Sequence, residues 1–160
     1  MKRIISLFMM IFIFGCSNSV MKNKETLVVE LKSVIKAQNV NGLIELLHPK
    51  CKDLVGHNNN KYIKFLLKAS ESCFSEESEV KLTEFGNATL PSSQRWPVKP
   101  KYILHLCSIA IPITEDEFGW SVVIGIPNEK TMKVINEINL DNYVPPVPDL
   151  KSNIKRKKLI

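Results

Sequence analysis

Four histidine and cysteine side chains in the first half of the chain have the chemistry to bind a metal ion. His48, Cys51, His57 and Cys73 could offer two imidazoles and two thiolates, a donor set that zinc accepts. Their spacing, H-x2-C-x5-H followed by one distant cysteine, matches no zinc motif, and an oxidising compartment would compete for the thiols. The sequence therefore predicts no metal site and no cofactor.

A second pair of side chains could act in general acid–base catalysis. His105 projects from a predicted strand, where it could line a pocket, and Glu84 belongs to another predicted strand. A buried histidine that is satisfied by a hydrogen bond is the commoner arrangement. The chain also lacks the G-x-S-x-G, H-E-x-x-H and glycine-rich phosphate-binding motifs. An enzyme that uses His105 and Glu84 is therefore only the alternative hypothesis.

One long loop combines cationic and aromatic residues. The stretch QRWPVKPKY contains Arg95, Trp96, Lys99 and Tyr102. Because Trp, Tyr and Arg dominate binding hot spots, these four residues form a candidate binding surface. The simpler alternative is that Trp96 pins its own loop to the core.

The spacing of apolar residues predicts helices in the first half of the chain and strands in the second. Helical periodicity predicts helices over 25–38, 41–47 and 61–70, the last two capped by Asn41 and Asn60. Strand patterns predict strands over 80–85, 101–111, 120–126 and 131–140. The expected fold class is α+β, with N-terminal helices packed on a curved antiparallel sheet of about four strands.

The segment 25–140 resembles the nuclear transport factor 2-like family, a cone-shaped α+β fold. The resemblance lies in the order of the elements and in VIKAQNVNGLIELLHP, which indicates a helix, a small break and a short second helix that ends at proline. It implies a cone-shaped pocket and, because such folds often pair through the sheet, a homodimer as one candidate assembly. Enzymes of this fold place an acidic or histidine base in the cone, and no residue here matches that role.

Two of the predicted strands are apolar on both faces. A sheet with one solvated face should alternate apolar and polar side chains, which the segments 101–111 and 120–126 do not do. The second face is therefore expected to be covered by a partner subunit, by the Pro-rich tail or by a target protein.

The N-terminus has the pattern of a secretory signal. Two basic residues precede the apolar run 4–14, which is too short to cross a bilayer. Ile13-Phe14-Gly15-Cys16 resembles the lipobox of bacterial lipoproteins, although Phe14 is larger than the usual residue. The resemblance implies cleavage after Gly15 and acylation of Cys16. Ser17, which is not Asp, resembles the outer-membrane sorting class.

The resemblance implies that the protein lies in the cell envelope, on the outer membrane facing the periplasm, where disulfides are permitted. Cys51 and Cys73 follow two predicted helices, and a bridge between them would contribute about 3 kcal/mol in the chain-entropy model. The alternative is that the thiols are unpaired.

Basic charge is concentrated at the ends of the chain. The formal charge of +6 includes Lys2 and Arg3 in the signal and five basic residues in the last ten, KSNIKRKKLI, so the body is close to neutral. The expected organisation is a signal over 1–15, a polar tether over 16–24, one domain over 25–140 and a Pro-rich, basic tail over 141–160. Such a tail is usually solvated, and it could also attract anionic lipids.

These patterns together predict a membrane-anchored envelope lipoprotein. Its membrane partner is bound through acylated Cys16, and its small α+β domain binds an unknown envelope protein or small ligand without catalysis. Nucleic acid is not an expected partner. The alternatives are a pocket enzyme that uses His105 and a structural accessory of an envelope or secretion complex.

Overall fold

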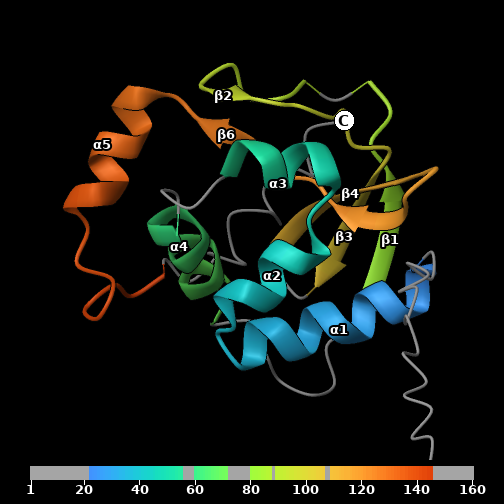
Figure 1. Cartoon of the computed structure of the whole chain (residues 1–160), viewed down its shortest axis with the longest axis horizontal. Helices are drawn as coiled ribbons and strands as arrows, with labels where there is room; N and C mark the ends of the chain where they lie inside the picture. Colours follow the sequence, from blue (N-terminus) through green and yellow to red (C-terminus); the bar gives the residue numbers. More distant parts are fainter. Residues whose placement is uncertain (1–21, 56–59, 72–79, 88, 107–108, 146–160) are drawn as a thin grey trace, which may run out of the picture.

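The computed structural model describes residues 22–55, 60–71, 80–87, 89–106 and 109–145 (Figure 1). The helices are α1 (Lys24–Lys36), α2 (Val40–Leu46), α3 (Pro49–Val55), α4 (Asn60–Ser70) and α5 (Glu129–Glu137). The strands are β1 (Val80–Glu84), β2 (Gln94–Arg95), β3 (Tyr102–Leu106), β4 (Ile109–Asp116), β5 (Gly119–Val122) and β6 (Ile126–Pro127). An antiparallel sheet has the order β1-β3-β4-β5, and β2 pairs with β6. The predicted α+β class is confirmed.

Asparagine caps define where the first two helices begin. The Asn23 side chain accepts a hydrogen bond from the Thr26 N–H at 2.7 Å and starts α1. Gln38, with φ of 51°, takes the left-handed conformation just after α1. Asn39 then caps α2 by accepting from the Gly42 N–H at 2.9 Å. The prediction that Asn41 is this cap was wrong, because α1 ends at Lys36, two residues earlier than predicted, and the cap moves by the same two residues.

Helix α3 was not predicted. The sequence correctly indicated that α2 ends before Pro49, but proline was taken only as a stop signal. Pro49 is the first residue of α3, where its missing N–H costs nothing and its fixed φ suits a helix. His48 precedes it, and the His48 carbonyl accepts from the Cys51 and Lys52 N–H groups. A proline can therefore end one helix and begin the next.

Three strand predictions were wrong in whole or in part. The segment 120–126 is divided, because β5 ends at Val122 and β6 begins at Ile126 in the other sheet. The segment 101–111 is not one strand, because β3 and β4 pair antiparallel with Leu106 opposite Ile109 and the chain reverses between them. The segment 131–140 is mostly helix α5, whose cap Asn128 accepts from the Thr131 N–H at 2.9 Å. The sheet thus has four strands, but not the four that were predicted.

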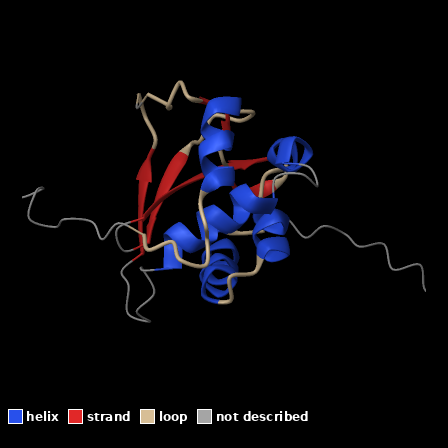
Figure 2. Ribbon diagram, turned by 90° about the vertical axis from the view of Figure 1, so that its left-hand side faces the viewer, coloured by secondary structure: helices blue, strands red, loops and turns tan. Residues whose placement is uncertain are grey.

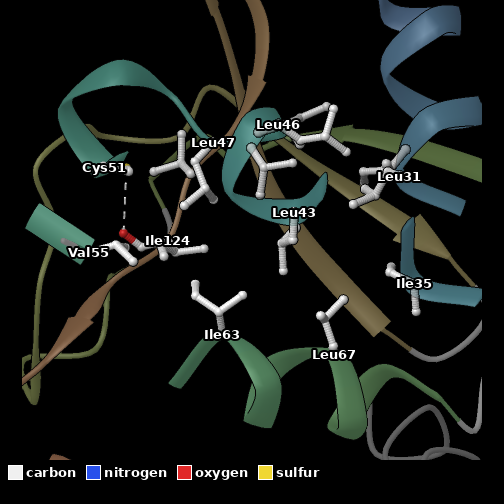
Figure 3. Close-up of a cluster of buried hydrophobic side chains, with 14 of the residues drawn as sticks. Leu31, Ile35, Leu43, Leu46, Leu47, Cys51, Val55, Ile63, Leu67 and Ile124 are labelled. Carbon is white, nitrogen blue, oxygen red and sulfur yellow. Dashed lines mark hydrogen bonds between the residues drawn. The ribbon is translucent and has the colours of Figure 1, made fainter. Parts of the chain in front are cut away.

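The helices lie mainly on one side of the sheet, as Figure 2 shows, and the buried hydrophobic side chains of both form one core. Helix α1 buries Leu27, Leu31 and Ile35, and α4 buries Ile63 and Leu67 (Figure 3). The sheet contributes a matching set of buried side chains: Leu104, Leu106, Ile113 and Val122. Each such side chain contributes about 1.5–3 kcal/mol when it is fully buried. Among the described residues no helix is long and apolar enough to span a bilayer.

The second face of the sheet differs from one end to the other. At the β4–β5 end, Thr114 and Ser121 face each other across the ladder and are 2% and 6% exposed, so the chain covers this end itself. At the β1–β3 end, Lys81 is exposed and His105, its pairing partner, is half-buried. Only the second of these ends offers a face for the covering partner that the sequence predicts.

Candidate binding site

The edge of β5 is closed at two points by neighbouring chain. Lys22 forms a parallel bridge with Gly119, and its carbonyl accepts from the Trp120 N–H at 3.0 Å. Leu47 forms a second parallel bridge with Val122, and the His48 N–H donates to the Val122 carbonyl at 2.9 Å. Residues Lys22 and Asn23, which the sequence assigned to the tether, therefore contact the domain.

A groove lies along this edge, and we call it the β5-edge groove. Its volume is about 490 Å³, and its lining includes Leu46, Leu47, Lys52, Phe118, Trp120 and Ser121. The Ser121 hydroxyl oxygen is buried and has no hydrogen-bond partner among the described residues. Ligand sites are typically concave, with apolar and aromatic walls and a few polar groups, and the groove has this composition.

Aromatic side chains form one wall of the β5-edge groove. Trp120 stacks on Tyr102, with ring centroids 5.1 Å apart and an angle of 28° between the planes. Phe118 occupies the two-residue turn between Asp116 and Gly119 and is 49% exposed. These rings provide apolar contact area that is already ordered before a ligand arrives.

Ion pairs occupy the rim of the groove. Lys52 contacts Glu45 at 3.0 Å, and Lys22 contacts Glu30. The Glu45 side chain is 74% exposed, so solvent and salt screen this pair and it contributes little stability. The rim is therefore close to neutral and easily rearranged by a ligand.

His48 joins the groove to the tip of the β4–β5 hairpin. It is 1% exposed, and its Nδ1 accepts from the Lys50 N–H at 3.1 Å, which caps α3. Since Nδ1 is an acceptor, Nε2 carries the proton and donates to Asp116 Oδ2 at 2.8 Å. The His48 ring also meets Phe118 edge-on, with centroids 5.4 Å apart. Both ring nitrogens are occupied, so His48 has a positioning role and no free lone pair for base catalysis.

Asp116 is held as a carboxylate. Desolvation by burial raises its pKa, but hydrogen bonds from the Phe118 N–H and from His48, together with the positive charge of Lys101, lower it more. The result is a pKa below the ordinary value of 3.8. Asp116 therefore accepts the hydrogen bonds from His48 and from the Phe118 N–H as an anion in the neutral pH range.

The structure does not bring His105 and Glu84 together. His105 pairs with Lys81 across the ladder, whereas Glu84 pairs with Tyr102, so the two side chains lie on opposite faces of the sheet. His105 Nε2 is 2.9 Å from the Thr83 hydroxyl oxygen, and Glu84 is exposed at the end of β1. Neither residue lines the β5-edge groove.

The four residues of the predicted binding loop are also divided. Arg95 pairs with Ile126 and is exposed, as is Lys99. Trp96 is half-buried and lies so close to Gly125 that a Cβ there would be 2.7 Å from its ring. Tyr102 stacks on Trp120 at the groove. Trp96 thus packs its own loop against the core, and only Tyr102 supports the candidate site.

Cys51 is a buried free thiol on the inner face of α3. Its Sγ lies 3.8 Å from the Ile124 carbonyl oxygen, as Figure 3 shows, and burial raises its pKa above 9.0. Cys73 lies outside the described residues, as do His57, Gly15 and Cys16, so the predicted bridge and the predicted lipidation stay predictions. Within the described ranges no three His, Cys, Asp or Glu side chains converge as a metal site.

Phe118, Trp120 and the His48–Asp116 pair carry no sequence motif that marks them as functional. One signal was available: a phenylalanine in the turn segment EDEFG, where turns ordinarily carry polar residues. The pairing of His48 with Asp116 spans 68 positions and leaves no local pattern.

Comparison of the chain with protein-family models, curated proteins and solved structures found no match. The resemblances to bacterial lipoproteins and to the nuclear transport factor 2-like fold therefore stay predictions from the sequence.

Proposed function

We propose that this chain is a lipid-anchored protein of the bacterial envelope that binds a protein segment or small ligand in the β5-edge groove. The observation that carries the proposal is the groove itself, with Phe118 and Trp120 exposed to it and a volume of about 490 Å³. A cavity of this size accommodates a small ligand or several side chains of a partner.

The proposed anchor and the groove are close neighbours. The chain enters the domain at Lys22, which lines the groove, and the lipobox cysteine, Cys16, is only six positions earlier in the sequence. A doubly or triply acylated cysteine holds a protein on a membrane without help from other segments. The groove would therefore operate at the membrane.

The geometry favours binding over catalysis. The one buried histidine of the described residues, His48, uses both ring nitrogens to cap α3 and to contact Asp116. His105 contacts Thr83 on the opposite face from Glu84. A second cavity, of about 120 Å³ between the helices and the sheet, is lined by apolar groups such as Leu31, Leu67 and Ile111 and lacks catalytic side chains.

Site-specific crosslinking tests this proposal. A photo-crosslinking amino acid at Glu45 places the probe on the rim of the groove, and the same amino acid at Glu137, exposed on α5, is the matched control. Both variants are expressed in the native envelope and irradiated. We expect one discrete adduct from position 45 and none from position 137. Equal adducts from both positions, or none from position 45, would contradict binding in the groove.

A further inference from the structure

The β4–β5 turn presents a fixed aromatic ring to solvent. Phe118 is 49% exposed, and the other large hydrophobic side chains exposed among the described residues are all valines. Asp116 accepts from the Phe118 N–H at 3.0 Å, and Gly119 takes a φ of 82° that side-chain-bearing residues rarely adopt. The His48 ring contacts the Phe118 ring edge-on. The turn is built to hold this ring outward.

The chain enters the domain directly beside this turn. Lys22 pairs with Gly119, the residue after Phe118, in parallel. Cys16 is six residues before Lys22, so covalent geometry keeps the two Cα atoms within about 22 Å whatever path the chain takes between them. An acylated Cys16 therefore keeps the β4–β5 turn close to the lipid head groups.

We propose that the β4–β5 turn is the membrane-facing surface of the domain, with the Phe118 ring resting in the head-group region of the bilayer. This inference rests on the proposed lipid anchor. Phenylalanine is one of the apolar side chains that membrane-surface segments bury at the boundary between head groups and acyl chains, and such a contact beside an acyl anchor fixes the orientation of the domain. The occupant of this surface is a zwitterionic lipid surface, because Glu115, Asp116 and Glu117 at the turn would be repelled by anionic lipid.

The chain contains two tryptophans, and their fluorescence can report on this orientation. Trp120 follows the turn and bonds to Lys22, whereas Trp96 packs on Gly125, beyond the far end of the strand. Trp96→Phe leaves Trp120 as the only tryptophan, and Trp120→Phe leaves Trp96. The acylated full chain is reconstituted in phosphatidylcholine vesicles whose acyl chains carry bromine, which quenches nearby tryptophan.

We expect Trp120 emission to be quenched about twofold more strongly than Trp96 emission. Phe118→Ser in the Trp96→Phe chain should reduce the quenching of Trp120. The matched control is Val134→Ser, which removes an exposed apolar side chain from α5 and should change nothing. Circular dichroism checks that each variant is folded.

Each remaining outcome overturns a defined statement. A chain that has no acyl mass and does not float with vesicles overturns the proposed anchor and this inference together. A chain that floats, but whose two tryptophans are quenched equally, overturns the orientation and leaves the anchor intact. Quenching of Trp120 that is unchanged by Phe118→Ser overturns the role of Phe118.

Discussion

The histidine at the β5 end of the sheet and the histidine at the β1 end differ in burial and in the contacts they make. At the β5 end, His48 is 1% exposed, caps α3 and contacts a carboxylate 68 positions away. At the β1 end, His105 is half-buried and meets only the hydroxyl of Thr83 on the neighbouring strand. In β5 the neighbouring residues Ser121 and Val122, which lie on opposite faces, are both buried, whereas in β1 Val80 and Lys81 are both exposed. The same side chain is therefore a structural connector in one place and a surface residue in the other.

The largest expected effect is the protection of the Cys51 thiol from alkylation in the folded protein. Cys51 is a fully buried residue of α3, and burial raises the pKa of its thiol, so the reactive thiolate is scarce. We expect alkylation of Cys51 in the folded protein to be about a thousandfold slower than in denaturant, because it requires opening of the core. Peptide mass spectrometry measures the rate.

The same labelling decides the predicted bridge. Without reductant, Cys51 should label in denaturant as a free thiol. Labelling in denaturant that requires prior reduction would instead establish a disulfide and contradict the free thiol of the structure.

Removal of each histidine gives the next largest effect. His48→Ala should lower the free energy of unfolding by about 3 kcal/mol, because it uncaps α3 and removes the partner of Asp116. His105→Ala should cost about 1 kcal/mol or less, because it removes one half-buried hydrogen bond. Urea denaturation measures both. His48→Asn restores a good helix cap and should recover part of the loss; equal losses for His48→Ala and His105→Ala would refute the comparison.

The pH dependence of the free energy of unfolding measures how much the charge of the Asp116 carboxylate contributes to stability. Since its pKa in the folded protein is below 3.8, its stabilising contribution is present above that pH and disappears as pH falls through the folded-state pKa. Asp116→Asn should therefore cost about 1 kcal/mol at pH 7, and the difference from the unmodified chain should vanish in acid. Asp141→Asn, at an exposed position, is the control. A difference that is constant with pH would show that the charge is unimportant.

The rim of the β5-edge groove should show the smallest effect. Glu45→Gln breaks the ion pair with Lys52, which is screened by solvent, and should change the free energy of unfolding by less than about 0.5 kcal/mol. Denaturation at low and high salt measures this. A loss above 1 kcal/mol would mean that the rim is structural rather than a surface free to engage a ligand.

Local sequence patterns predicted an element correctly where the residues of that element alone favour its conformation. The helical spacing of Leu27, Leu31 and Ile35 predicted α1, and the predicted helix over 61–70 is α4, which begins one residue earlier at Asn60. Local patterns failed where tertiary contacts override them. The apolar run continues from β3 into β4 with Ser108 as its single turn-favouring residue, so the reversal between Leu106 and Ile109 was missed. In α5 the β-branched residues favoured a strand, while the Asn128 cap and the burial of Ile135 favour a helix.

The sequence by itself determined the α+β class, the main helices and a predicted anchor at Cys16, because periodicity and signal motifs are local. Only the tertiary structure decided the site. It joined Lys22, Leu47 and Trp120 at the edge of β5, placed His48 against Asp116, and separated His105 from Glu84. These relations depend on strand register and on contacts between distant segments, and a one-residue change of register would reverse which face each side chain occupies.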